Sequence, residues 1–182
     1  MHRRRPLDGG HDAGAVNEDL GLEEKEITFE VAMRLEKLLC NYETVLTRQD
    51  DRFIGLTDRA MVANTAGADI FVSIHCNSFT NESAGGIETW HYTGSKYGKM
   101  LAEFAQGEFV EFFDMPDRGI KDNERFGVLR HTQMPAIITE VGFISNPKEA
   151  KKMETYRYRQ GYAECVKKAI DQYCEEVSKN DG

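Results

Sequence analysis

Two polar side chains in this sequence follow apolar runs that are typical of buried strands, and both are of types that bind metals or transfer protons. His75 follows the apolar run 70–74, and Glu140 follows the apolar run 136–139. A carboxylate among apolar strand residues is costly to bury unless it is paired, protonated or bound to a metal. A histidine after a strand is often only a hydrogen-bonded surface residue. Position alone therefore makes both residues candidates, and Glu140 is the more informative of the two.

A zinc hydrolase would use these residue types together. It needs three protein ligands, an open position for water, and a carboxylate that accepts and returns a proton. His75, Glu24, a second histidine and Glu140 would meet that need. Glu24 by itself is typical of a helix start, where it stabilises the helix dipole. The residues are far apart in the chain, so their spacing does not show that they meet.

The elements that must position these residues alternate between helix and strand patterns. Apolar spacing predicts helices at 23–40, 58–65, 97–113 and about 156–177. It predicts strands at 43–47, 69–74, 86–92, 126–129 and 136–141. Asn146-Pro147 is typical of the start of a further helix. We expect a single α/β domain with a twisted, mostly parallel mixed sheet of about five to six strands and helices on both faces. If the strands before His75 and Glu140 run parallel, both residues lie at one rim of the sheet.

Composition restricts the partners of the chain. The formal net charge is −8, and the basic cluster at 3–5 is typical of a solvated tail, so we expect no nucleic-acid partner. No apolar run approaches the roughly 20 residues that span a bilayer, and no apolar signal-peptide core follows the basic start. We expect a monomer without a membrane span or an export signal in this chain. The four cysteines form no C-x-x-C pair and are expected not to form disulfides.

A set of short segments adds a family resemblance, because their order is specific although each is weak alone. The segments are Asp12-Ala-Gly14-Ala15, Glu24-Lys25-Glu26-Ile27, Thr47-Arg48-x-x-Asp51, Leu56-x-x-Arg59-x-x-x-Ala63-Asn64, Ala68-Asp69-Ile70-Phe71-Val72-Ser73-Ile74-His75-Cys76-Asn77, Gly86-Ile87-Glu88-Thr89, Arg118-Gly119-Ile120-Lys121, Val128-Leu129-Arg130, Met134-Pro135-Ala136 and Glu140-Val-Gly142-Phe143-Ile144-Ser145-Asn146. From about Gly9 to the C-terminal helix, the sequence resembles the zinc-dependent N-acetylmuramoyl-L-alanine amidases, the cell-wall and endolysin family called amidase type 3.

The resemblance implies one catalytic Zn²⁺ with Glu24 and His75 as ligands, and Glu140 as the general acid/base. The implied reaction is hydrolysis of the amide between N-acetylmuramic acid and L-alanine in peptidoglycan, so the chain would act at the bacterial cell wall. Asn77 and Arg130 would position the substrate. Residues 9–179 would form the catalytic domain, after an irregular stretch at 1–8.

The start of the chain departs from the family pattern, whose first zinc ligand is a histidine after an apolar strand. In one alignment His11 is that ligand; in another, Asp8 occupies its position; we favour His11 because imidazole suits zinc. In a third interpretation, the start is damaged: residues 2–6 can be encoded by codons that a one-base shift reads as Ile-Asp-Ala-Gly-His, which is a family-like opening. The gene's nucleotide sequence distinguishes that interpretation from the other two.

Because this motif is broken, an alternative function stays open. The chain could be an inactive wall-binding or regulatory domain on the same fold. A zinc peptidase that cuts elsewhere in the stem peptide is the third hypothesis.

Overall fold

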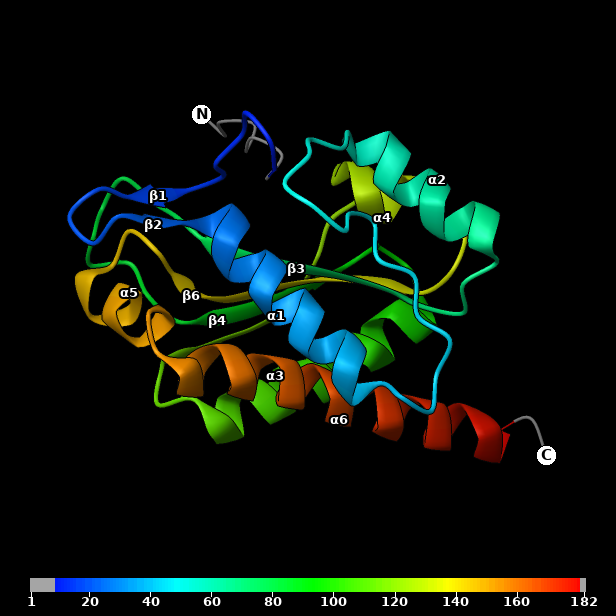
Figure 1. Cartoon of the computed structure of the whole chain (residues 1–182). Coiled ribbons are helices and arrows are strands. Elements are labelled where there is room, and N and C mark those ends of the chain that lie inside the picture. Colours follow the sequence, from blue (N-terminus) through cyan, green and yellow to red (C-terminus); the bar gives the residue numbers. More distant parts are fainter. Residues whose placement is uncertain (1–8, 181–182) are drawn as a thin grey trace.

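The computed structural model describes residues 9–180, in which strands and helices alternate along the chain (Figure 1). The strands are β1 (Val16–Asn17), β2 (Leu22–Glu23), β3 (Phe71–Asn77), β4 (Ile87–His91), β5 (Asp117–Asp122) and β6 (Ala136–Phe143). The helices are α1 (Glu24–Leu38), α2 (Leu56–Ala66), α3 (Lys96–Phe112), α4 (Gly127–His131), α5 (Pro147–Met153) and α6 (Tyr156–Asn180).

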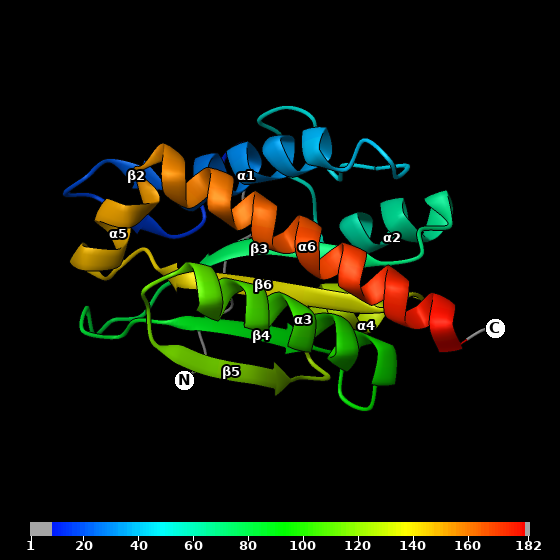
Figure 2. The same ribbon diagram turned by 90° about the horizontal axis from the view of Figure 1, so that it is seen from below.

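The four longer strands form one mixed sheet in the order β3-β6-β4-β5 (Figure 2), and β1 and β2 form a small antiparallel pair (Figure 1). β3 runs parallel to β6 and β4 runs parallel to β5, whereas β4 and β6 are antiparallel. The expected single α/β domain with a mostly parallel mixed sheet is therefore confirmed. The parallel pairing of β3 with β6 is the part of this topology that positions the candidate site.

Helices cover both faces of the sheet, as expected. α1, α3 and α6 pack together on one face, and α2 and α4 pack on each other on the opposite face (Figures 1 and 2). Along β6, Ile137 and Val141 join the core under the three-helix layer, while Ala136 and Ile138 join the core under α2 and α4. Because side chains alternate along a strand, Glu140 points to the same face as Ala136 and Ile138.

Two strand predictions are wrong, and the sequence did not predict β5 or the short pair β1 and β2. Segment 43–47 has no regular structure and lies at the surface, where Val45 is half exposed. Segment 126–129 mostly belongs to helix α4, because a short apolar run fits either element and tertiary packing decides. β5 was missed because its sequence, DRGIKD, is polar, which is typical of an exposed edge strand.

Two further findings concern the cysteines and the helices of the described residues. None of the four cysteines forms a disulfide. Within 9–180, no helix combines the length and the apolar character that a membrane crossing requires.

The packing of α6 on α3 gives a stability prediction at Gly161. A Cβ on Gly161 would lie 2.1 Å from the Phe112 ring, so Gly161→Ala must displace that ring. We expect Gly161→Ala to lower the free energy of unfolding by up to about 2 kcal/mol, since overpacking costs about 1–3 kcal/mol and the helix-propensity gain offsets about 1 kcal/mol of it. Denaturant unfolding measures the change.

The matched control for this prediction is Gly107→Ala in α3. A Cβ on Gly107 would meet no atom within 4 Å, so only the propensity gain applies and the variant is expected to be more stable than wild type. A stabilised Gly161→Ala variant would contradict the packing argument.

Candidate active site

Three side chains form a row across the sheet, one from each of three neighbouring strands. Glu140 on β6 is in register with His75 on β3 and with Glu88 on β4. Residues in register on adjacent strands point to the same face, so the row lies on the face that carries α2 and α4. Both carboxylates are buried, with Glu140 only 6% exposed. The expectation that His75 and Glu140 meet at one rim is confirmed at the level of strand pairing.

Glu24, the first residue of α1, joins this row at the β3 side. Its Oε1 lies 2.9 Å from Nδ1 of His75 and accepts a hydrogen bond from the backbone N–H of Cys76. Its Oε2 accepts a hydrogen bond from the N–H of Ala15 in the preceding loop. Burial opposes ionisation of Glu24, but the hydrogen bond and charge attraction with His75 outweigh it and lower the pKa of Glu24. The pair is therefore a fixed carboxylate held against an imidazole.

The sheet position of His75 is supported from the three-helix layer by Tyr162 of α6. The Tyr162 hydroxyl lies 2.7 Å from Oγ1 of Thr139 and donates toward the backbone carbonyls of His75 and Thr139. Burial raises the pKa of Tyr162 well above its usual value, so the hydroxyl stays a neutral donor. On the site face, Oγ of Ser73 lies 3.0 Å from Nε2 of His75. Both ring nitrogens of His75 therefore have polar neighbours.

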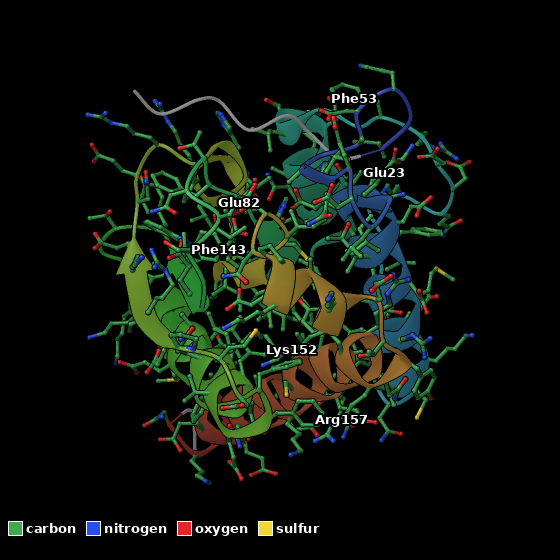
Figure 3. All side chains as sticks on the ribbon, turned by 90° about the vertical axis from the view of Figure 1, so that its left-hand side faces the viewer. Glu23, Phe53, Glu82, Phe143, Lys152 and Arg157 are labelled. Atoms are coloured by element: carbon green, nitrogen blue, oxygen red, sulfur yellow. The ribbon has the colours of Figure 1, made fainter. Side chains whose placement is uncertain are left out.

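A bulge ends the pairing of β3 and β6 just beyond the row. His75 pairs with Glu140, but Asn77 pairs with Phe143, so β6 holds an extra residue. Gly142 in this bulge has φ +90°, a conformation that favours glycine. The bulge turns the end of β6 toward α5; in Figure 3, Phe143 marks this end of the strand.

Glu88 extends the row into a cluster with two cations. Its Oε2 accepts hydrogen bonds from Arg118 Nε at 2.7 Å and Lys121 Nζ at 2.6 Å, both on β5. Its Oε1 accepts from Asn77 Nδ2 at 2.9 Å and Trp90 Nε1 at 3.2 Å. Burial would raise the pKa of Glu88, but the bonds to Arg118 and Lys121 outweigh it and the pKa is lowered.

Sequence reasoning missed this role of Glu88, although the signal was present. Glu88 stands between Ile87 and Thr89 in a strand-like run, which is the same pattern that singled out Glu140. Asn77, expected to touch substrate, is only 4% exposed and holds Glu88.

Two site candidates remain, His11 and Arg130. The His11 ring packs on Phe53, with 4.7 Å between ring centroids, and does not join Glu24 and His75; Phe53 and the adjacent blue loop are at the upper right of Figure 3. Arg130 is exposed on α4. The alternative first ligand, Asp8, and the irregular stretch expected at 1–8 lie outside the described residues.

The donor set fits a zinc ion in part. Two donors on a tetrahedral zinc lie roughly 3.4 Å apart, for bonds of about 2.0–2.2 Å, and the Glu24–His75 oxygen–nitrogen distance of 2.9 Å is close to that separation. One carboxylate and one imidazole are also ligand types that zinc prefers. Within residues 9–180, no third histidine, cysteine or carboxylate completes a metal-binding group with them.

Comparison with known proteins identifies the family. The family model described as N-acetylmuramoyl-L-alanine amidase matches residues 5–172. A relative from Bacillus subtilis (strain 168), the uncharacterized protein YqiI, is 37% identical over 170 residues, covering 91% of this chain and 80% of the relative. The sporulation-specific N-acetylmuramoyl-L-alanine amidase of the same organism is 38% identical over 165 residues, covering 87% of this chain and 62% of that protein.

Solved structures agree with this similarity. The N-acetylmuramoyl-L-alanine amidase from Clostridium difficile 630 superposes with a TM-score of 0.87 and 36% identity, covering 93% of this chain and 94% of that chain. The catalytic domain of CwlV, an N-acetylmuramoyl-L-alanine amidase from Bacillus (Paenibacillus) polymyxa var. colistinus, superposes with a TM-score of 0.86 and 33% identity, covering 92% and 94%. This chain belongs to the N-acetylmuramoyl-L-alanine amidase family.

The name of the family states its reaction. That reaction is hydrolysis of the amide bond between N-acetylmuramic acid and L-alanine in peptidoglycan. The family and the reaction expected from the sequence motifs are confirmed by these comparisons.

Proposed function

We propose that the chain is a zinc-dependent amidase in which Glu24 and His75 hold the metal and Glu140 is the general acid/base. The observation that carries this proposal is the row of Glu140 and His75 in register, with Glu24 against His75. Zinc, when bound, would polarise the amide carbonyl and lower the pKa of water.

The protein groups divide the remaining work. Glu140 accepts a proton from the attacking water and returns it to the departing amine of L-alanine. Its burial on the sheet keeps its carboxylate in one position. The backbone N–H groups of Ala15 and Cys76 donate hydrogen bonds to Glu24 and fix its carboxylate beside His75. This support is typical of ligands that must hold a metal in fixed geometry.

The third ligand remains a proposal for His11, with Asp8 as the alternative. His11 follows two glycines with positive φ, Gly9 and Gly10, and its contact with Phe53 is at the protein surface. The proposal is tested by zinc content: His11→Ala is expected to bind less zinc than wild type, and unchanged zinc content would contradict the ligand role of His11.

Metal removal tests the other two ligands. A chelator is expected to abolish hydrolysis, and wild type is expected to hold about one zinc per chain, the stoichiometry of a catalytic zinc site. Glu24→Gln is expected to lose most of the zinc, because an amide replaces the ionised ligand. Elemental analysis of the purified protein gives this result without an activity assay.

The matched control is Glu23→Gln, one residue earlier on β2. Glu23 is partly exposed and pairs with Lys25 rather than with His75. It is expected to keep full zinc content. Full zinc content in Glu24→Gln would contradict the proposed metal site.

The reaction itself is tested on purified peptidoglycan. The proposal predicts new free L-alanine amino termini, identified by mass analysis of the digested muropeptides. Products cut within the stem peptide would instead support a peptidase.

A second candidate function is an inactive wall-binding or regulatory domain. It is favoured because, within residues 9–180, no third histidine, cysteine or carboxylate completes a metal-binding group with Glu24 and His75. Such a protein binds peptidoglycan but releases no amino termini above a metal-free control. In both cases we propose that the chain acts as a monomer at the bacterial cell wall, outside the cytoplasm or after release by a phage.

A further inference from the structure

The cationic pair on β5 is not used by the proposed chemistry. Arg118 and Lys121 both contact Oε2 of Glu88, which is 6% exposed in its side chain. The side chains of Arg118 and Lys121 are 38% and 32% exposed, so both cations also reach solvent. The pair is unusual in a chain whose net charge is −8.

The cluster is built to hold its cations in place. Arg118 lies 5.0 Å from the ring centroid of Phe143, and Lys121 lies 5.2 Å from that of Trp90. A cation above an aromatic ring is attracted to the negative face of that ring, so these contacts hold both side chains in position. Glu88 carries one negative charge, so one positive charge of the pair is not balanced within the trio. A fixed, partly exposed cation of this kind can accept a carboxylate from a ligand.

The position of the pair specifies which carboxylate it can reach. Neighbouring strands lie about 4.8 Å apart, so β5 is about 10 Å from β6 and Glu140. The Arg118 side chain extends back over β4 to Glu88, which shortens that separation. Successive residues of a bound peptide advance by about 3.3–3.6 Å. If the stem peptide runs from Glu140 toward β5, the residue that follows L-alanine comes within reach of the Arg118 side chain.

We propose that Arg118 and Lys121 form a subsite for a carboxylate on the second residue of the stem peptide. The inference rests on the proposed function, because that function places the scissile amide beside Glu140. In this subsite, Arg118 and Lys121 determine substrate specificity, and Glu88 holds both side chains in position. A substrate in which that carboxylate is an amide loses a charge-assisted contact and is bound less well.

The test compares two soluble substrates, N-acetylmuramoyl-L-alanyl-D-glutamate and its α-carboxamide. Wild type is expected to hydrolyse the carboxylate form with a kcat/KM about tenfold higher, the size of one charge-assisted hydrogen bond. Arg118→Gln is expected to bring that ratio near one, mainly through a higher KM for the carboxylate form. General damage to the site would lower both values and leave the ratio unchanged.

The matched control is Arg125→Gln, which removes the same charge from an exposed arginine just after β5. It is expected to keep the wild-type ratio. If Arg118→Gln does not fold, Lys121→Gln is expected to change the ratio in the same direction. A wild-type ratio of one, or an equal ratio in Arg118→Gln and Arg125→Gln, overturns the subsite.

A binding measurement separates this inference from the proposed function. Calorimetry with Glu140→Gln protein, which leaves the substrate uncut, is expected to show the same preference for the carboxylate form. If wild type hydrolyses neither substrate but this preference is present, the amidase proposal fails and the subsite stands. If hydrolysis is normal and the preference is absent, the subsite fails alone.

Discussion

Glu140→Gln is expected to lower kcat for amide hydrolysis by about 10²–10⁴-fold, the usual contribution of a general acid/base. The variant keeps the size and a polar character of the side chain but cannot accept or return a proton. Glu140 lies beside His75 in the strand register, so its carboxylate is next to the proposed metal position. Rates of amino-terminus release from peptidoglycan, measured under saturating substrate, give the change in kcat.

Two further measurements identify the reason for the loss. Zinc content is expected to stay at the wild-type value, because Glu140 is proposed as the acid/base and not as a ligand. The limb of the pH–rate profile that reports ionisation of Glu140 is expected to disappear. Glu124→Gln is the matched control, since Glu124 is exposed on the loop after β5. A Glu140→Gln protein with near wild-type kcat would overturn the assigned role.

The site residues that could be predicted from the sequence are those whose position depends on a local pattern of apolar residues. His75 and Glu140 each follow an apolar run rich in β-branched residues, which favours a buried strand. Once β3 and β6 are parallel, the two residues are in register. Glu24 was predicted only through the family resemblance, because a glutamate at a helix start is typical of any helix.

The parts that sequence missed depend on contacts between distant elements. Glu88 acquires its role from Arg118 and Lys121, some thirty residues later on β5. The polar sequence of β5 contains no strand signal, so neither the strand nor the cluster was predicted. The wrong strand at 126–129 has a related cause. Val128 and Leu129 are both buried, but α4 buries them under α2 and not in the sheet.

The position of His11 shows a different limit. A histidine that follows two glycines is compatible with many loop conformations, because glycine tolerates both signs of φ. The sequence therefore proposes His11 as a ligand by its residue type but does not predict its position in space.

Glu149→Ala is expected to be the most destabilising of the substitutions considered, by about 2–5 kcal/mol in the free energy of unfolding. Glu149 is 5% exposed at the start of α5. Its Oε1 accepts the N–H of Gly86 at 2.8 Å, and its Oε2 accepts the N–H of Phe143 at 2.7 Å. Removing the carboxylate leaves two buried donors without an acceptor, each at a cost of about 1–3 kcal/mol. Denaturant unfolding measures the loss.

Glu149→Gln separates the loss of the acceptor from the loss of side-chain volume. An amide of nearly the same shape keeps one acceptor oxygen but presents an NH₂ group to the other N–H, so we expect an intermediate loss of about 1–3 kcal/mol. Glu154→Ala, at the exposed end of α5, is the control and is expected to change stability by less than about 0.5 kcal/mol.

Because Gly86 precedes β4 and Phe143 ends β6, Glu149 also fixes the strands that carry Glu88 and Glu140. A Glu149→Ala protein as stable as wild type would show that these two N–H groups find other acceptors, and that the bulge does not depend on α5.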